Sequence, residues 1–311
     1  MIISCSRRTD IPAFYSDWFF NRLREGYVLV RNPMNPKQVR QVSLAPPDVD
    51  CIVFWTKDPA PILDKLHLLK DYNYYFQFTL TPYGKGIEPN LPPKTEIVDT
   101  FISLSDKIGK KRIIWRYDPI LLSESIDIDY HMDRFHDLAR RLSGCTDKCI
   151  ISFMDMYRHI QCKMADLSVR PPDESEMRKL AEKLVRIAES FNVNIATCAE
   201  KIDLAGLGIE HGKCIDDLLI SELIGTKLKI EKDKYQRELC GCVSCIDIGE
   251  YNTCSHLCIY CYASFSQKTV KKNHALHNDK APLLIGEISE KQKISERKTP
   301  SILAKQSDLF A

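Results

Sequence analysis

Short apolar runs rich in β-branched and aromatic residues alternate with segments of helical period along most of the chain. The apolar runs predict strands at 2–5, 28–31, 51–55, 74–80, 112–116, 149–154 and 193–198, and an eighth strand fits within 207–215. The helical pattern covers 16–25, 59–70, 95–108, 129–143 and 173–191. Because strands that alternate with helices are typical of a parallel sheet wrapped by helices, we expect an α/β fold. Its predicted form is a (β/α)8 TIM-barrel-like structure, irregular or incomplete.

The irregular part of the predicted barrel is residues 32–50, which are rich in proline and predict a loop. An open, doubly wound sheet is the alternative. No glycine-rich dinucleotide fingerprint and no Walker sequence follows any predicted strand, which makes the common nucleotide-binding folds less favourable.

The charge and composition of the chain exclude few classes of function. The 44 basic and 42 acidic residues give a net charge of +2, so any contact with nucleic acid would need a local basic patch. No apolar run approaches the roughly 18 residues of a membrane span, and the first residues lack a signal-peptide pattern, so we expect a cytoplasmic protein. The 13 cysteines predict metal ligation rather than disulfides, and six of them lie between Cys240 and Cys261.

The most specific motif is the C-x3-C-x2-C spacing of Cys254, Cys258 and Cys261, with Tyr260 directly before the last cysteine. Three thiolates on so short a loop suit three corners of a [4Fe–4S] cubane. The fourth iron then stays free for an outside ligand, which in radical chemistry is the amino and carboxylate groups of S-adenosylmethionine. The alternative is a structural zinc site, in which His256 joins the three cysteines.

Cys240, Cys242 and Cys245 form an upstream trio. They could ligate a second cluster, supply a further ligand to the first, bind zinc, or include a bystander thiol. The sequence leaves these alternatives open. We therefore expect a barrel over 1–235, a cluster-binding segment packed on it at 236–263, and a polar, lysine-rich tail over 264–311 that is extended or partly disordered.

Several stretches carry a family resemblance: SRRTDIPAFY at 6–15, RNPMNPKQV at 31–39, VFWTKDPAP at 53–61, WRYDPI at 115–120, TCAE at 197–200, CGC at 240–242 and DIGEYNTCSHLCIYCYA at 247–263. With these, the chain resembles the bacterial domain-of-unknown-function family DUF1848, radical S-adenosylmethionine-like iron–sulfur proteins with a C-terminal cysteine motif. The resemblance implies a barrel-like fold and an iron–sulfur cluster that needs an electron donor, without an established substrate. In ordinary radical S-adenosylmethionine enzymes the triad follows the first strand, whereas here it follows the last.

Charged residues recur where predicted strands end, which is where barrel enzymes place their catalytic groups. The candidate catalytic residues are Arg7, Arg8, Asp10, Lys57, Arg116, Asp118 and Glu200. An arginine among them could clamp a carboxylate or phosphate, and a carboxylate could hold a ribose or an ammonium group. Each of them could instead cap a helix or begin a loop.

The last residues, with Gln306, Leu309 and Phe310, resemble the short peptide by which bacterial DNA-processing proteins dock on the sliding clamp. An apolar end that folds back on the barrel is the alternative. Two functions follow from the sequence. The first is a radical S-adenosylmethionine enzyme that generates a 5′-deoxyadenosyl radical, with nucleic acid repair or modification as one context. The second is a non-catalytic zinc or redox-sensing iron–sulfur module recruited to a DNA-associated partner.

Overall fold

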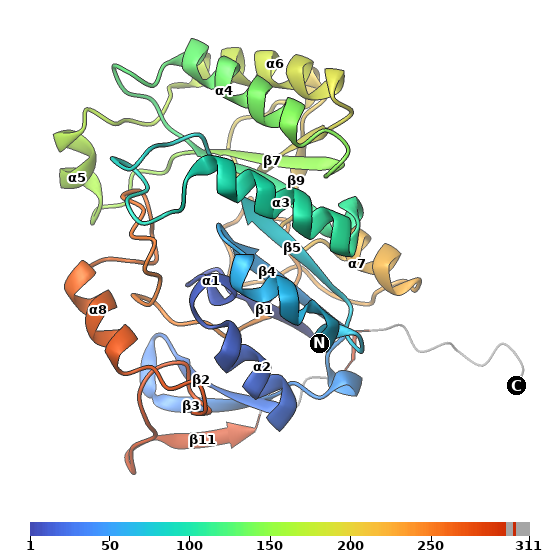
Figure 1. Cartoon of the computed structure of the whole chain (residues 1–311), viewed down its shortest axis with the longest axis vertical. Coiled ribbons are helices and arrows are strands. Elements are labelled where there is room, and N and C mark those ends of the chain that lie inside the picture. Colours follow the sequence, from blue (N-terminus) through green and yellow to red (C-terminus); the bar gives the residue numbers. More distant parts are fainter. Residues whose placement is uncertain (297–300, 303–311) are drawn as a thin grey trace, which may run out of the picture.

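The main element of the fold is an eight-stranded sheet, seen in a computed structural model that describes residues 1–296 and 301–302 (Figure 1). The strand order is β10-β1-β4-β5-β6-β7-β8-β9, and all neighbouring strands in it are parallel. The strands are β1 (Ile2–Cys5), β4 (Cys51–Thr56), β5 (Tyr74–Thr79), β6 (Ile113–Ile120), β7 (Lys148–Phe153), β8 (Asn194–Cys198), β9 (Glu210–Gly212) and β10 (Ile246–Asp247). The predicted α/β class is therefore confirmed.

The two edges of this sheet are the short strands β9 and β10. Within the part of the chain that the structure describes, no ladder of hydrogen bonds joins these two strands, so the pairings leave the sheet open between them. The sequence did not predict β10, because two residues are too short for a periodicity signal.

A second, three-stranded sheet corrects the prediction for residues 27–50. Strand β2 (Tyr27–Asn32) pairs antiparallel with β3 (Asn35–Ser43), and β11 (Lys293–Glu296) pairs parallel with β3. The predicted strand 28–31 therefore does not belong to the main sheet, and the predicted loop 32–50 contains a strand. Only Val39 and Val42 of β3 are buried, so its sequence carries too few apolar positions to be recognised as a strand.

The helices are α1 (Ile11–Phe14), α2 (Ser16–Glu25), α3 (Lys94–Ile108), α4 (Ile128–Arg141), α5 (Gln161–Asp166), α6 (Glu174–Ser190), α7 (Asp217–Ile224) and α8 (Gln267–Ala275). Helices α2, α3, α4 and α6 agree with predicted segments, the predicted helix at 59–70 is a 3₁₀ segment, and α1, α5, α7 and α8 were not predicted. Four 3₁₀ segments are η1 (Pro46–Asp48), η2 (Ala60–Leu69), η3 (Lys110–Arg112) and η4 (Ala205–Leu207). Helix α6 begins with the predicted capping box of Asp173 and Glu176.

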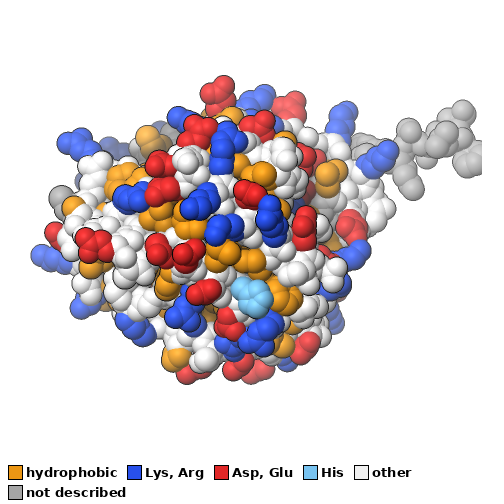
Figure 2. Space-filling model, turned by 90° about the horizontal axis from the view of Figure 1, so that it is seen from above, with side chains coloured by type: hydrophobic (Ala, Val, Ile, Leu, Met, Phe, Trp, Pro, Cys, Tyr) orange, Lys and Arg blue, Asp and Glu red, His pale blue; other side chains and the backbone are white. Residues whose placement is uncertain are grey.

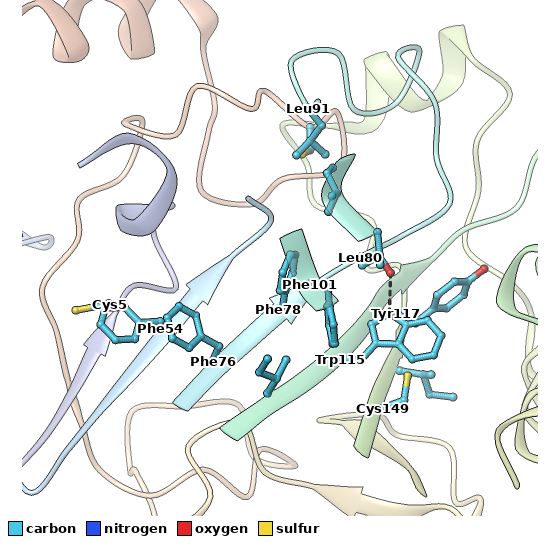
Figure 3. Close-up of a cluster of buried hydrophobic side chains, with 14 of the residues drawn as sticks. Cys5, Phe54, Phe76, Phe78, Leu80, Leu91, Phe101, Trp115, Tyr117 and Cys149 are labelled. Carbon is cyan, nitrogen blue, oxygen red and sulfur yellow. Dashed lines mark hydrogen bonds between the residues drawn. The ribbon is translucent and has the colours of Figure 1, made fainter. Parts of the chain in front are cut away.

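The core divides between the two faces of the sheet with a period of two residues. On one face, Phe54 stacks on Phe76 with 4.7 Å between ring centroids (Figure 3). On the same face, Trp115 stacks on Phe135 at 4.8 Å. On the other face lies a cluster that includes Ile2, Val53, Tyr75, Ile114, Ile150, Cys214, Ile215 and Val243. Residues from beyond both sheet edges thus pack together on this second face.

The chain after residue 264 differs from the expected tail. Helix α8 begins at Gln267, and Leu283 is buried and forms a β-bridge with Leu29. The Trp18 indole N–H donates to the carbonyls of Ala281 and Leu283 at 2.9 and 3.1 Å. The expectation of an extended tail is therefore wrong for residues 264–296, because these few apolar side chains pack against α2 and β2. The predicted clamp-binding residues Gln306, Leu309 and Phe310 lie outside the described residues.

No helix in the described part of the chain has the length and apolar character needed to cross a membrane.

Candidate functional site

One cavity of about 490 Å³ collects most of the residues that the sequence singled out. Its volume is within the range of small-molecule binding sites. The predicted residues that line it are Arg7, Arg8, Asp10, Lys57, Arg116, Asp118, Cys240, Cys242, Cys254, Cys258, Tyr260 and Cys261. Glu200 and Cys245 are not among its lining residues. Segments far apart in the sequence meet here because parallel strands present their carboxyl ends at the same edge of a sheet.

The cysteine motif reaches this cavity through β10, which pairs parallel with β1 in the register Ile3↔Ile246. The loop after β10 therefore leaves the sheet beside the loop after β1. The backbone N–H of Ala263 donates to the Cys261 sulfur at 3.4 Å, and that of His256 donates to the Cys254 sulfur. Hydrogen bonds to the ligand sulfurs are among the features that tune iron–sulfur clusters.

The surroundings of the motif thiols favour their protonated form. Burial raises the pKa of Cys258 to about 12, and burial also raises the pKa of Cys254, so their thiolates need a cation beside them, which a metal supplies. Within the described ranges, no three histidine, cysteine or carboxylate side chains are arranged to hold one metal ion. A cubane needs a different arrangement, because its thiolates bind separate irons.

Asp10 and His256 join the motif to the first loop. One oxygen of Asp10 accepts from the backbone N–H of Lys57 at 2.7 Å and lies 2.9 Å from His256 Nε2, and the other caps α1 by accepting from Ala13 at 3.0 Å. All of these groups except Ala13 belong to the cavity wall. Asp10 is therefore a positioning residue, and the sequence had singled it out as catalytic.

Buried polar atoms without a partner gather at the cavity. Among the described residues these include Thr9 Oγ1, Trp55 Nε1 and His256 Nδ1, all from lining residues. A buried unsatisfied donor or acceptor costs about 1–3 kcal/mol, so the presence of such atoms in a folded protein calls for an explanation. A polar ligand in the cavity provides one.

Glu88 is a buried carboxylate that sequence reasoning missed. It forms ion pairs with Lys57, at 2.8 Å, and with Lys94, and it accepts hydrogen bonds from Tyr260 and, at 2.8 Å, from Thr81. Burial alone would raise its pKa, but the two lysines lower it to about 2. Glu88 follows the fifth strand in a loop without a sequence signal, and it anchors the motif tyrosine beside Cys258.

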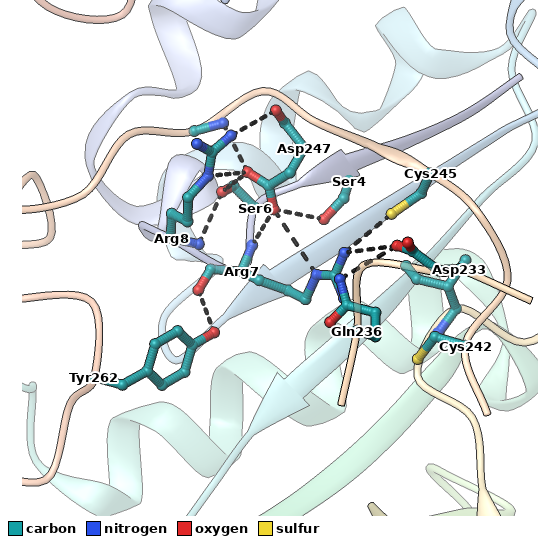
Figure 4. Close-up of polar contacts among 12 residues, drawn as sticks. Ser4, Ser6, Arg7, Arg8, Asp233, Gln236, Cys242, Cys245, Asp247 and Tyr262 are labelled. Carbon is teal, nitrogen blue, oxygen red and sulfur yellow. Dashed lines mark hydrogen bonds and ion pairs between the residues drawn. The ribbon is translucent and has the colours of Figure 1, made fainter. Parts of the chain in front are cut away.

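Asp247 holds the two arginines of the first loop (Figure 4). Its carboxylate accepts from Ser6 at 2.6 Å, from the Arg7 backbone N–H at 2.8 Å and from Arg8 Nε at 3.0 Å. Burial alone would raise the pKa of Asp247, but Arg8 and Ser6 hold it below its ordinary value. The Arg7 guanidinium donates to the Cys245 sulfur at 3.2 Å.

Arg116 and Asp118 form an ion pair on another part of the wall, where Asp118 also accepts from Ser152. Arg116 lies 5.1 Å from the centre of the Trp55 ring and donates to the Cys214 sulfur at 2.8 Å. Glu200 instead accepts from the Phe153 backbone N–H at 2.9 Å, and burial raises its pKa to about 7. Glu200 does not line the cavity, and its hydrogen bond holds the backbone at the end of β7.

Cys198 and Cys214 are cavity residues that the sequence did not predict. Their sulfurs lie 3.2 Å apart, and the Cys242 sulfur accepts from the backbone N–H groups of Cys214 and Ile215, each at 3.3 Å. Cys198 lies in the TCAE stretch that carried the family resemblance, which was the available signal. Cys214 follows a three-residue strand and had none.

The outer surface carries no single sign of charge on the face seen in Figure 2, where basic and acidic side chains are interspersed. This agrees with the near balance of charges in the sequence.

Comparison with known proteins gives one match. A family model described as "Domain of unknown function (DUF1848)" matches residues 2–263. No curated protein sequence matches the chain.

Proposed function

The chain belongs to the DUF1848 family, and from this premise we propose that it is a [4Fe–4S] enzyme of the radical S-adenosylmethionine type. The observation that carries the proposal is the convergence of Cys254, Cys258 and Cys261 on one cavity of about 490 Å³. The spacing of the three cysteines supplies three cluster ligands and leaves one iron for a small molecule.

When bound, the cluster would supply the electron that cleaves S-adenosylmethionine to a 5′-deoxyadenosyl radical, which abstracts hydrogen from a substrate. The protein's own part is to hold the three thiolates, to keep water out of the cavity and to orient the ligand. Thr9, Trp55 and His256, whose buried polar atoms lack partners within the described residues, are suited to bind polar groups of that ligand.

Positioning of the cysteine loop falls to two buried carboxylates. Asp10 connects His256 to the backbone of Lys57, and Glu88 connects Tyr260 to Lys57 and Lys94. The motif residues in these contacts are His256 and Tyr260, which lie between its cysteines in the sequence. They would fix the loop in one conformation, so that a cluster binds without a large ordering cost.

We extend the proposal to the shape of the sheet, which we take to be a (β/α)8 barrel. Ile2 of β1 and Ile150 of β7 belong to the same buried cluster as Ile215 and Val243, which come from beyond the two edge strands. The backbone N–H of Val243 donates to the carbonyl of Ile215 at 3.2 Å. This contact would bridge the gap between β9 and β10.

The test is anaerobic. The chain is purified without oxygen, reconstituted with iron and sulfide, and reduced with dithionite in the presence of S-adenosylmethionine. We expect brown protein with iron and sulfide in the ratio of one cubane per chain, and formation of 5′-deoxyadenosine. The matched control is Cys145→Ser, a half-buried cysteine outside the cavity. It should behave as the wild type, whereas replacement of Cys254, Cys258 and Cys261 by alanine should abolish both results. A reducible cluster that yields no 5′-deoxyadenosine would overturn the enzyme proposal.

A second candidate is a non-catalytic metal-binding module. One observation favours it: the cavity cations Arg8, Lys57 and Arg116 are each paired with a carboxylate of the protein, so their charges are already neutralised. Colourless protein with stoichiometric zinc at the trio would support this candidate. A nucleic acid substrate and docking on a sliding clamp through Gln306, Leu309 and Phe310 stay predictions, and loss of clamp binding on removal of residues 306–311 would test the latter.

A further inference from the structure

Four cysteines from three chain segments meet on the cavity wall, away from the cluster trio. Cys198 ends β8, Cys214 follows β9 by two residues, and Cys240 and Cys242 precede β10. The sulfurs of Cys198 and Cys214 lie 3.2 Å apart, and the Cys242 sulfur lies 3.3 Å from the backbone nitrogens of Cys214 and Ile215. All four residues line the cavity.

The surroundings of these cysteines suit anionic sulfur. The Cys242 sulfur accepts two backbone N–H groups at 3.3 Å, and Arg116 donates to the Cys214 sulfur at 2.8 Å. The carbonyl of Cys214 is fixed by the Tyr75 hydroxyl at 2.6 Å and by the Gln77 amide at 2.9 Å. Such donors and anchors are the outer contacts that orient the ligands of a metal.

We propose that Cys198, Cys214, Cys240 and Cys242 form a second metal site that binds one zinc ion through four thiolates. Four cysteine ligands are the standard donor set of structural zinc. The contact between the Cys198 and Cys214 sulfurs favours a single ion, because a cubane holds its thiolates apart on separate irons. This assignment excludes Cys245, which the sequence had grouped with Cys240 and Cys242 and which contacts Arg7 instead.

The sulfurs of Cys198 and Cys214 are at present closer together than zinc would hold them. Zinc–sulfur bonds of about 2.3 Å in a tetrahedron place the sulfurs about 3.8 Å apart. Because the Cys198 and Cys214 sulfurs are 3.2 Å apart, zinc binding requires these two sulfurs to separate by roughly 0.5 Å. The thiols also lose their protons when they bind the ion. Among the described residues no group of three or more such side chains is arranged to hold an ion in the present form, so zinc binding requires this rearrangement.

The position of the site gives it a structural role. Cys198 and Cys214 belong to the side of the sheet that ends in β9, and Cys240 and Cys242 belong to the segment that leads into β10 at the opposite edge. Hydrogen bonds do not connect these two strands in the described chain. An ion held by both sides would therefore tie the two edges of the sheet together.

The experiment measures metal content by mass spectrometry of the full chain, purified without oxygen and without added metal. We expect one zinc per chain in the wild type and in the variant that lacks Cys254, Cys258 and Cys261. We expect at least a tenfold loss of zinc in Cys240→Ser/Cys242→Ser and in Cys198→Ser, and none in the matched control Cys245→Ser. The failure of the cluster and the failure of the zinc site are thus separate results.

A second measurement guards against variants that do not fold. Wild-type chain is exchanged with Co²⁺, for which a tetrathiolate site gives intense sulfur-to-cobalt charge-transfer bands and visible d–d bands. Alkylation should spare the four cysteines until a chelator removes the ion. Absence of zinc and of a cobalt spectrum, a second iron–sulfur cluster, or a metal-free Cys198–Cys214 disulfide in the native chain would each overturn the proposal.

Discussion

Replacement of Glu88 by glutamine tests whether the buried charge cluster beside the cysteine motif holds the fold together. The change keeps the size of the side chain but removes the negative charge that Lys57 and Lys94 share. Because the Glu88 side chain is fully buried, both lysines would be left without their counter-charge. Removal of one partner of a buried ion pair costs about 3–5 kcal/mol.

The pKa of Glu88 gives a similar magnitude. It falls from its ordinary value of 4.5 to about 2 in the folded chain, and this difference corresponds to about 3 kcal/mol of stability. The sign follows from the lowered pKa: the folded chain holds the carboxylate ionised more strongly than the unfolded chain. The contribution is therefore complete above pH 4.5 and is lost as the pH falls toward about 2.

The assay is urea unfolding followed by tryptophan fluorescence at pH 7, with the pH series extended downward. The matched control is Glu176→Gln, because hydrogen bonds from Arg170 and the α6 cap also lower the pKa of Glu176 to about 2, but on the surface. We expect Glu88→Gln to lose about 3 kcal/mol and Glu176→Gln at most about 1 kcal/mol. If the two variants lose equal stability, or if Glu88→Gln loses less than about 1 kcal/mol, burial is not what makes this cluster strong.

Three further changes test other parts of the site. Gly249→Ala places a Cβ 2.1 Å from Ser6 Oγ, so it should displace the loop that follows β10, cost about 1–3 kcal/mol in urea unfolding and lower the iron content of reconstituted protein. Tyr260→Phe removes a hydrogen bond to the charged Glu88 and should cost about 1.5–3 kcal/mol in the same assay, and no change in stability would mean that the hydroxyl does not anchor the motif. Burial raises the pKa of Glu200 from 4.5 to about 7, so the folded chain retains a proton that the unfolded chain releases, and stability should fall as the pH rises between these values. Glu200→Gln should flatten that decline, and a wild type whose stability rises over this interval would contradict the assignment.

The sequence by itself determined the α/β class, most strands of the main sheet and the spacing of the cysteine motif. Strands β4, β5 and β6 each begin with a run of at least three apolar or aromatic residues, because a parallel sheet is covered on both faces, so their pattern is local and readable. The spacing of Cys254, Cys258 and Cys261 is local as well, since one short loop contains all three cysteines. Helix α6 was predicted at its start from its capping box, another local signal.

Only the tertiary structure decided which residues share the site. The order of the strands places β10 beside β1, and a two-residue strand has no pattern from which this neighbour could be inferred. For the same reason the sequence could not choose among the alternatives for the upstream trio: Cys245 contacts Arg7, while Cys214 comes to Cys242 from a distant segment and contacts Cys198. Periodicity reports which face of an element is buried, but contacts between elements depend on strand order, which is fixed by the packing of the whole chain.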